Sequence, residues 1–175
     1  MRKVLVVVDM QNDFIDGALG TAEAVAIVPR VVEKIREYEP RDVYLTRDTH
    51  YENYLETQEG RNLPVPHCIR GTDGWQIRAE VAEAAEGAAV VDKPTFGSAE
   101  LAGRLMAERT RDALELELVG LCTDICVVSN ALLLKAAMPE VPITVDAACC
   151  AGVTPEKHRA ALETMRSCQI RVINE

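Results

Sequence analysis

Hydrophobic and polar positions follow two different rhythms along this chain. Short apolar runs of the β type predict strands near residues 3–8, 41–46, 88–92, 113–119, 141–146 and 169–173. Apolar residues at helical spacing predict helices near residues 22–38, 74–86, 97–109, 124–138 and 154–166. Because parallel strands are usually joined by helical crossovers, this alternation predicts an α/β domain with a parallel sheet.

The length and composition fit one domain. The chain has 175 residues, of which 48% are hydrophobic, and a chain of this size can bury one large core. It contains no internal repeat, no low-complexity stretch and no linker to a second domain. Residues 1–175 are therefore expected to form a single domain.

The charge of the chain limits its partners. The formal net charge is −9 at pH 7, and neither nucleic acid nor an anionic membrane surface attracts a net acidic protein. No segment approaches the roughly 20 apolar residues of a transmembrane helix. The basic start, Met1-Arg2-Lys3, leads into only five apolar residues before Asp9, which is too short for a secretion signal. We expect a cytoplasmic protein with no nucleic-acid or membrane partner.

Six cysteines raise the question of disulfide bonds. They stand at positions 68, 122, 126, 149, 150 and 168. The chain has no secretion signal and no CxxC pair of the kind that zinc ribbons use, so we expect mostly reduced thiols. Small buried hydrophobic residues are the simplest interpretation of four of them, Cys122, Cys149, Cys150 and Cys168.

Cys126 follows the fourth predicted strand at a position that suits a nucleophile. The strand breaks at Gly120, and residues 121–127 lead into a helical pattern, which places the cysteine in a first helical turn. Unpaired N–H groups at a helix N-terminus are partly positive, so they favour a thiolate and lower the pKa of a cysteine there. On this segment alone, a buried structural cysteine stays open as the alternative.

Two other predicted strands end in charged residues that a thiol nucleophile can use. Asp9 follows the first strand, and Lys93 follows the third. A carboxylate can take the thiol proton, and a lysine can stabilise the thiolate. Together with Cys126, these groups stand on three different strand ends.

The longest irregular segment, residues 47–73, carries two of the three histidines. Asp48 and His50 are two residues apart, so they point to the same side of an extended chain, and the later His67 can complete a metal site. A loop of this length is rarely a simple connection. Solvated loop residues remain the alternative, because an Asp-x-His pair with one more histidine is only moderately specific.

Three parts of the chain, taken together, resemble the cysteine hydrolase family that includes nicotinamidases, isochorismatase and N-carbamoylsarcosine amidase. They are Asp9 with the following Gln11-Asn12-Asp13-Phe14, Lys93, and the segment Gly120–Val127. The resemblance covers essentially the whole chain. It implies a three-layer α/β/α fold with a six-stranded parallel sheet of order 3-2-1-4-5-6, in which the carboxyl ends of the central strands form the ligand crevice.

The resemblance also implies roles for the residues at the strand ends. Asp9, Lys93 and Cys126 would form a catalytic triad, with a cis peptide between Leu121 and Cys122. The backbone N–H groups of Cys122 and Cys126 would form an oxyanion hole, which stabilises the charge that develops on a carbonyl oxygen during attack.

For the long loop, a resemblance to nicotinamidases implies a metal site. The ligands would be Asp48, His50, Glu59 and His67, with Glu56 as the alternative to Glu59 because the loop length varies in the family. This ligand set suits a divalent zinc, iron or manganese ion, with zinc the first choice. Isochorismatase-type relatives generally lack the set, so its presence favours the nicotinamidase branch.

The implied activity is hydrolysis of a small amide through a thioester, with nicotinamide as the expected substrate. Phe14 and Phe96 are the expected pocket residues. Many nicotinamidases carry an aromatic residue shortly before the last histidine ligand, whereas this chain has Pro64 at about that place. The alternatives are another hydrolase of the family, acting on a different small amide or an isochorismate-like compound, and a non-catalytic metabolite-binding protein. Homo-oligomers are common among relatives, but no feature of the sequence sets the number of subunits.

Overall fold

A single sheet of six strands forms the centre of the computed structural model, which describes residues 1–175. The strands are β1 (Arg2–Val8), β2 (Val43–Asp48), β3 (Ala89–Lys93), β4 (Leu114–Leu121), β5 (Ile143–Ala151) and β6 (Arg171–Ile173). All neighbouring strands run parallel, in the order β3-β2-β1-β4-β5-β6. The predicted parallel sheet and its strand order are therefore confirmed.

Seven α-helices lie between the strands along the chain. They are α1 (Asn12–Ile15), α2 (Ala22–Ile35), α3 (Gln58–Asn62), α4 (Ala79–Ala84), α5 (Ala99–Arg109), α6 (Val128–Ala137) and α7 (Pro155–Ser167). A π-helical turn at Thr123–Val127 leads into α6. The short helices α1 and α3 are ones that the apolar pattern did not predict. None of the helices combines the length and the apolar character needed to cross a bilayer.

The helix predicted over residues 74–86 was too long, because α4 covers only its second half. The first half is bonded to the loop after β1 instead. The N–H of Asn12 donates to the carbonyl of Gln76 (3.0 Å), and the N–H of Arg78 donates to the carbonyl of Met10 (2.8 Å). These bonds satisfy backbone groups that a longer helix would have used, and they hold the loop that follows β1 in place.

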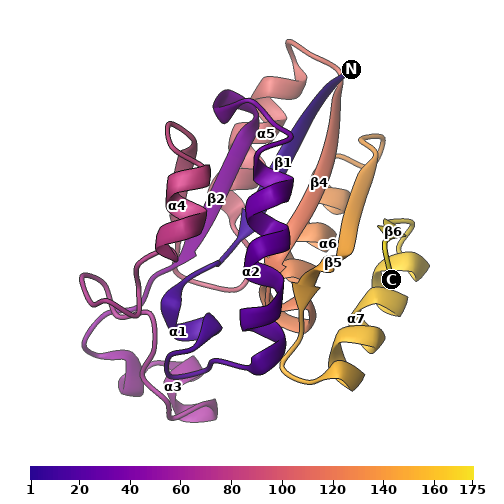
Figure 1. The fold of residues 1–175 in the computed structure, drawn as a ribbon. Helices are drawn as coiled ribbons and strands as arrows, with labels where there is room; N and C mark the ends of the chain where they lie inside the picture. The colour runs from indigo at the N-terminus through magenta and orange to yellow at the C-terminus, as the bar shows by residue number, and fades with distance from the viewer.

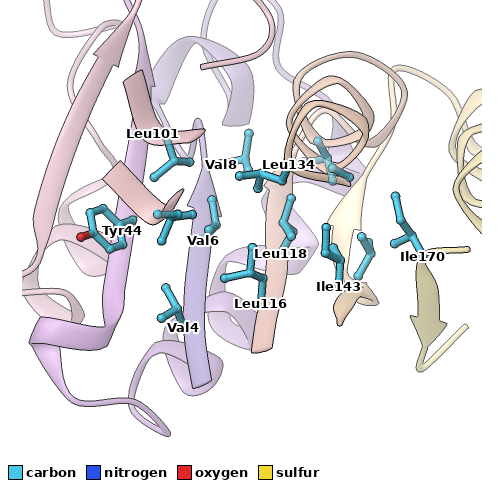
Figure 2. Close-up of a cluster of buried hydrophobic side chains, with 14 of the residues drawn as sticks. Val4, Val6, Val8, Tyr44, Leu101, Leu116, Leu118, Leu134, Ile143 and Ile170 are labelled. Carbon is cyan, nitrogen blue, oxygen red and sulfur yellow. The ribbon is translucent and has the colours of Figure 1, made fainter. Parts of the chain in front are cut away.

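The sheet is covered on both faces. Helices α2 and α4 lie on one face, and α5, α6 and α7 lie on the other (Figure 1). Residues Val4, Val6 and Val8 of β1 belong to the core beneath α5, α6 and α7 (Figure 2), whereas Leu5 and Val7 belong to the core beneath α2 and α4. A strand buried on both faces needs apolar residues at successive positions, which explains the uninterrupted apolar run of β1.

Strand β4 departs from this rule at Glu117, which faces α2 and is neutralised there. The ammonium of Lys34 lies 3.0 Å from Glu117 Oε1 and 3.2 Å from Asp146 Oδ2 of β5. The hydroxyl of Tyr38 donates to Glu117 Oε2 (2.6 Å). Burial alone lowers the pKa of Lys34, but the two carboxylates outweigh it and hold that pKa above its usual value. Lys34 is therefore a positive charge shared by the buried Asp146 and the partly buried Glu117.

Replacing Lys34 with methionine is expected to lower the free energy of unfolding by about 3 kcal/mol, because it leaves two carboxylates without their shared counter-charge. Chemical denaturation monitored by circular dichroism measures the change. The matched control is Lys157→Met, since Lys157 is an exposed lysine of α7 with no ion pair. Equal stability of the two variants would show that the Lys34 cluster contributes nothing.

Strand β5 extends well beyond residue 146, where the sequence predicted its end. Val145 pairs with Leu118, but the next paired residue is Cys150, opposite Gly120, so β5 carries extra residues at an irregularity in the ladder. The run from Ala147 to Ala151 holds only alanine and cysteine and lacks the β-branched and aromatic residues that favour strands, so nothing local indicated a strand. The pairing with β4 decides its conformation.

Candidate active site and metal centre

The residues singled out at strand ends all lie at the carboxyl edge of the sheet, beside α1 and α3 (Figure 1). Asp9 follows β1, and Cys126 lies in the turn after β4. Asp48 and Lys93 are the last residues of β2 and β3, and they are paired with each other in the sheet. Parallel pairing therefore brings together groups that are far apart in the sequence.

Close contact between β1 and β4 aims Asp9 at this edge. Gly120 of β4 has φ +115°, and a Cβ there would lie 2.1 Å from the carbonyl oxygen of Val8, so only glycine fits. Asp9 itself has φ 47°, a left-handed conformation that is uncommon for a residue with a side chain. Its N–H donates to the carbonyl of Thr46 (3.2 Å), which secures that turn.

Lys93 stands between Asp9 and Cys126, and all three side chains are buried. Its ammonium lies 2.6 Å from Asp9 Oδ2 and donates to the Cys126 Sγ at 3.4 Å and to the carbonyl of Thr95 at 3.0 Å. The other Asp9 oxygen accepts a hydrogen bond of 2.6 Å from the Thr46 hydroxyl. The three groups predicted as a triad are thus in direct contact.

Burial changes the proton affinities of these three groups. It raises the pKa of Asp9, and the Lys93 ammonium offsets only part of that rise. Burial by itself lowers the pKa of Lys93, but the facing Asp9 carboxylate outweighs it, so the lysine stays charged. For Cys126, burial raises the thiol pKa well above its usual value, and the Asp9 charge adds to the rise. The predicted lowering of this pKa was therefore wrong, because desolvation of the thiolate dominates.

The segment around Cys126 also differs from the predicted first turn of an α-helix. Cys126 lies in the π-helical turn that precedes α6, where the N–H groups of Ile125 and Val127 both donate to the carbonyl of Cys122. The peptide bond between Leu121 and Cys122 is cis, as predicted. The N–H of Cys122 donates to no acceptor in the chain. It is therefore free to bind a ligand.

Four potential metal ligands converge beside this group. They are Asp48, His50, Glu59 and His67, whose ligand atoms all lie within 4.8 Å of one another. His50 Nε2 is 2.9 Å from Asp48 Oδ2 and 3.5 Å from Glu59 Oε1. Glu56, the alternative ligand in the sequence, is exposed and lies outside the cluster. The first turn of α3 carries Glu59 into it.

The chemistry of the cluster fits a divalent metal ion. His67 Nδ1 bonds to the carbonyl of Val65 (2.8 Å), which can only accept, so the lone pair of Nε2 is left for the cluster. Asp48 Oδ1 is buried and has no hydrogen-bond partner. Although burial alone raises the pKa of Asp48, the hydrogen bond to His50 (2.9 Å) and the positive charge of Lys93 hold that pKa below its usual value, so a carboxylate faces the site. The side-chain amide of Gln11 holds the backbone of Asp48. Its Oε1 accepts from the Asp48 N–H (2.7 Å), and its Nε2 donates to the Asp48 carbonyl (2.8 Å).

A cavity of about 530 Å³ extends from the Cys126 thiol to the cluster of four potential metal ligands. Cys122, Cys126 and the four cluster residues line it, together with both phenylalanines of the chain. Phe14 is buried against His67, with ring centroids 5.5 Å apart, whereas Phe96 is 42% exposed. Leu63 lines the cavity, whereas Pro64, which stands at about the place of the aromatic residue of many nicotinamidases, does not.

The family model for the isochorismatase domain matches residues 3–175, which is nearly the whole chain. The chain belongs to the isochorismatase family. Its catalogued relatives include the nicotinamidase/pyrazinamidase of Mycobacterium tuberculosis (strain ATCC 25618 / H37Rv), which is 26% identical over 98% of both chains.

Solved structures give the same result. The pyrazinamidase of Pyrococcus horikoshii in complex with zinc is 28% identical, with a TM-score of 0.82 over the full length of both chains. The nicotinamidase/pyrazinamidase PncA from Bacillus subtilis is 27% identical, with a TM-score of 0.83 over 99% of this chain and all of that one. This isochorismatase-family chain thus shares its fold with two amidases, one of which is a zinc complex.

Two buried polar residues of this family member were missed by the sequence analysis. Thr46 bonds to Asp9, and Asn130 bonds to the backbone of Cys126. A polar residue in an otherwise apolar strand was the available signal for Thr46. For Asn130 there was none, because its partners lie on other elements. Tyr54, for which the sequence favoured a packing role, packs edge-on against both histidines of the cluster.

Proposed function

We propose that this isochorismatase-family protein is a metal-dependent cysteine amidohydrolase that converts nicotinamide to nicotinate and ammonia. The observation that carries the proposal is the buried contact of Lys93 with both Asp9 and Cys126, at the end of a cavity that also holds four metal ligands. A nicotinamidase/pyrazinamidase and zinc-bound pyrazinamidase among the relatives support it. In this proposal, residues 1–175 act as one catalytic domain.

The first chemical step uses the proton affinities of the triad. Cys126 rests as a neutral thiol because burial disfavours the thiolate. As Sγ attacks the carboxamide carbon, Asp9 accepts the thiol proton, which its raised pKa favours. Lys93 stays protonated and stabilises the negative charge that passes from Asp9 to sulfur as the proton moves.

The remaining steps return the site to its resting state. The carbonyl oxygen becomes negative in the tetrahedral intermediate, and the N–H groups of Cys122 and Cys126 stabilise it. The C–N bond then breaks, the leaving nitrogen takes the proton from Asp9, and ammonia departs from a thioester on Cys126. Water, deprotonated by Asp9, attacks the thioester. The C–S bond breaks, Cys126 recovers its proton, and nicotinate leaves.

Asp48, His50, Glu59 and His67 would hold the metal, with zinc as the proposed ion and iron or manganese as alternatives. When bound, the ion supplies a Lewis-acid contact for the ring nitrogen of the substrate, or for a water that bridges to it. Phe14 lies against His67 and provides an apolar wall beside the ring. The chain thereby orients the amide toward Cys126 and leaves proton transfer to Asp9.

All six cysteines are free in the structure, which fits a reducing compartment such as the cytoplasm.

A different small aromatic carboxamide is the second candidate substrate. The observation in its favour is Leu63 at the cavity wall, where an aliphatic side chain imposes less constraint on the shape of the ring than stacking does. A non-catalytic binding protein has no need of the assembled triad.

The test is release of ammonia from nicotinamide by purified protein of measured metal content. Metal-loaded protein is expected to release ammonia and nicotinate in equal amounts, with pyrazinamide as the second amide in the assay. Absence of release from both amides by folded, metal-loaded protein would overturn the proposed activity. Release from pyrazinamide alone would favour the second candidate.

A further inference from the structure

Asn130 of α6 bonds to two separate parts of the candidate active site. Its side chain is fully buried. Its Nδ2 donates to the carbonyl of Cys126 (2.8 Å) and to the carbonyl of Phe96 (3.1 Å), and its Oδ1 accepts from the N–H of Ser98 (2.9 Å). One amide thus joins the residue that carries the thiol to the segment that follows Lys93.

That segment, residues 94–98, connects β3 to α5 and borders the cavity. Between residues 94 and 97, its backbone makes only two hydrogen bonds to the rest of the chain. The Lys93 ammonium donates to the carbonyl of Thr95, and Asn130 donates to the carbonyl of Phe96. Without Asn130, the position of the segment would depend on the lysine that the proposed reaction also needs.

We propose that Asn130 is a positioning residue for this reaction, which holds the Cys126 turn and the 94–98 segment at a constant separation. The inference rests on the proposed function, and it concerns the 3.4 Å contact between Lys93 Nζ and Cys126 Sγ. A small misplacement of reacting groups costs about 100-fold in rate. A side chain that ties Cys126 to the segment directly after Lys93 protects the contact from such loss.

The amide group is required because it donates two hydrogen bonds and accepts one at the same site. Asn130→Asp keeps the shape and the acceptor for Ser98 but removes both donors. Asn130→Leu keeps a similar volume and removes every bond. If the leucine variant does not fold, the aspartate variant is used in its place.

The experiment measures kcat and KM for nicotinamide in metal-loaded wild-type and variant proteins. The expected result is a fall in kcat of about 100-fold with a change in KM below about 3-fold, because substrate contacts remain while the reacting groups move apart. Ile35→Ala is the control, since Ile35 is a core residue of α2 on the other face of the sheet. It lowers stability without touching either bonded segment.

A second readout separates this inference from the proposed function. Alkylation of Cys126 by iodoacetamide, followed by peptide mass spectrometry on metal-free protein, needs neither nicotinamide nor metal. We expect the rate to fall about 10-fold in the Asn130 variants and to stay unchanged in Ile35→Ala. Unchanged alkylation and kcat in a folded Asn130 variant would overturn the positioning role. Slowed alkylation in a protein that never hydrolyses nicotinamide would refute only the proposed substrate.

Discussion

Replacing Cys126 with alanine is expected to abolish ammonia release, lowering kcat by at least about 10⁴-fold, because Cys126 is the cavity thiol that contacts Lys93, whereas Cys122, the other cysteine of the lining, makes no side-chain hydrogen bond. The Asp9–Lys93 ion pair remains in the variant, so the buried lysine keeps a counter-charge and the fold is expected to persist. Steady-state kinetics, a thermal unfolding curve and metal analysis measure the three properties.

The matched control for this variant is Cys150→Ala. Cys150 is also a buried cysteine, but it does not line the cavity. We expect the control to retain kcat within about 3-fold of wild type, since its side chain only packs in the core. Wild-type rates in Cys126→Ala would refute the thioester mechanism.

The second large effect concerns the metal ligands. Glu59→Gln is expected to weaken metal binding by about 100-fold or more, because it replaces a negatively charged ligand with a neutral amide. Hydrolysis of nicotinamide is expected to fall in parallel, since a substrate without the metal contact is poorly oriented. Titration with zinc, monitored by a competing chelator, gives the affinity, and the kinetic assay gives the loss of activity.

Glu56→Gln supplies the control, because it makes the same chemical change three residues earlier, outside the cluster. Its metal affinity is expected to equal that of the wild type. Alkylation of Cys126 by iodoacetamide is expected to proceed equally in both variants, since the ion positions the substrate and does not activate the thiol. If Glu56→Gln were the variant that lost metal, the ligand assignment would be reversed.

The sequence contained much of what defines the site. Four site residues stand at or shortly after the end of an apolar run: Asp9, Asp48, Lys93 and Cys126. Such a run can be recognised as a buried strand from a few neighbouring residues alone. Once those strands are parallel, their carboxyl ends must meet at one edge. The three candidate groups at strand ends and the Asp-x-His pair therefore followed from short segments, whereas the resemblance to the cysteine hydrolase family implied that the three groups form a triad.

Electrostatic properties of the site did not follow in the same way. The position near a helix N-terminus predicted a lowered pKa for the Cys126 thiol. The pKa is instead raised because the thiol is buried, and its burial depends on the residues that pack around the turn. Likewise, Glu117 alternates with leucines in the sequence as though it faced solvent, whereas Lys34 of α2 covers it. Both outcomes depend on residues far away in the sequence.

The amino-acid sequence by itself determined the α/β class, the approximate places of the six strands, and the residue types available for thiol and metal chemistry, because these depend on local periodicity and on the chemical identity of side chains. The tertiary structure decided that Glu59 and not Glu56 joins the metal cluster, that Asn130 links Cys126 to Phe96, and that Asp9 is desolvated. Those properties arise from distances between segments, and packing sets such distances only when the whole chain has folded.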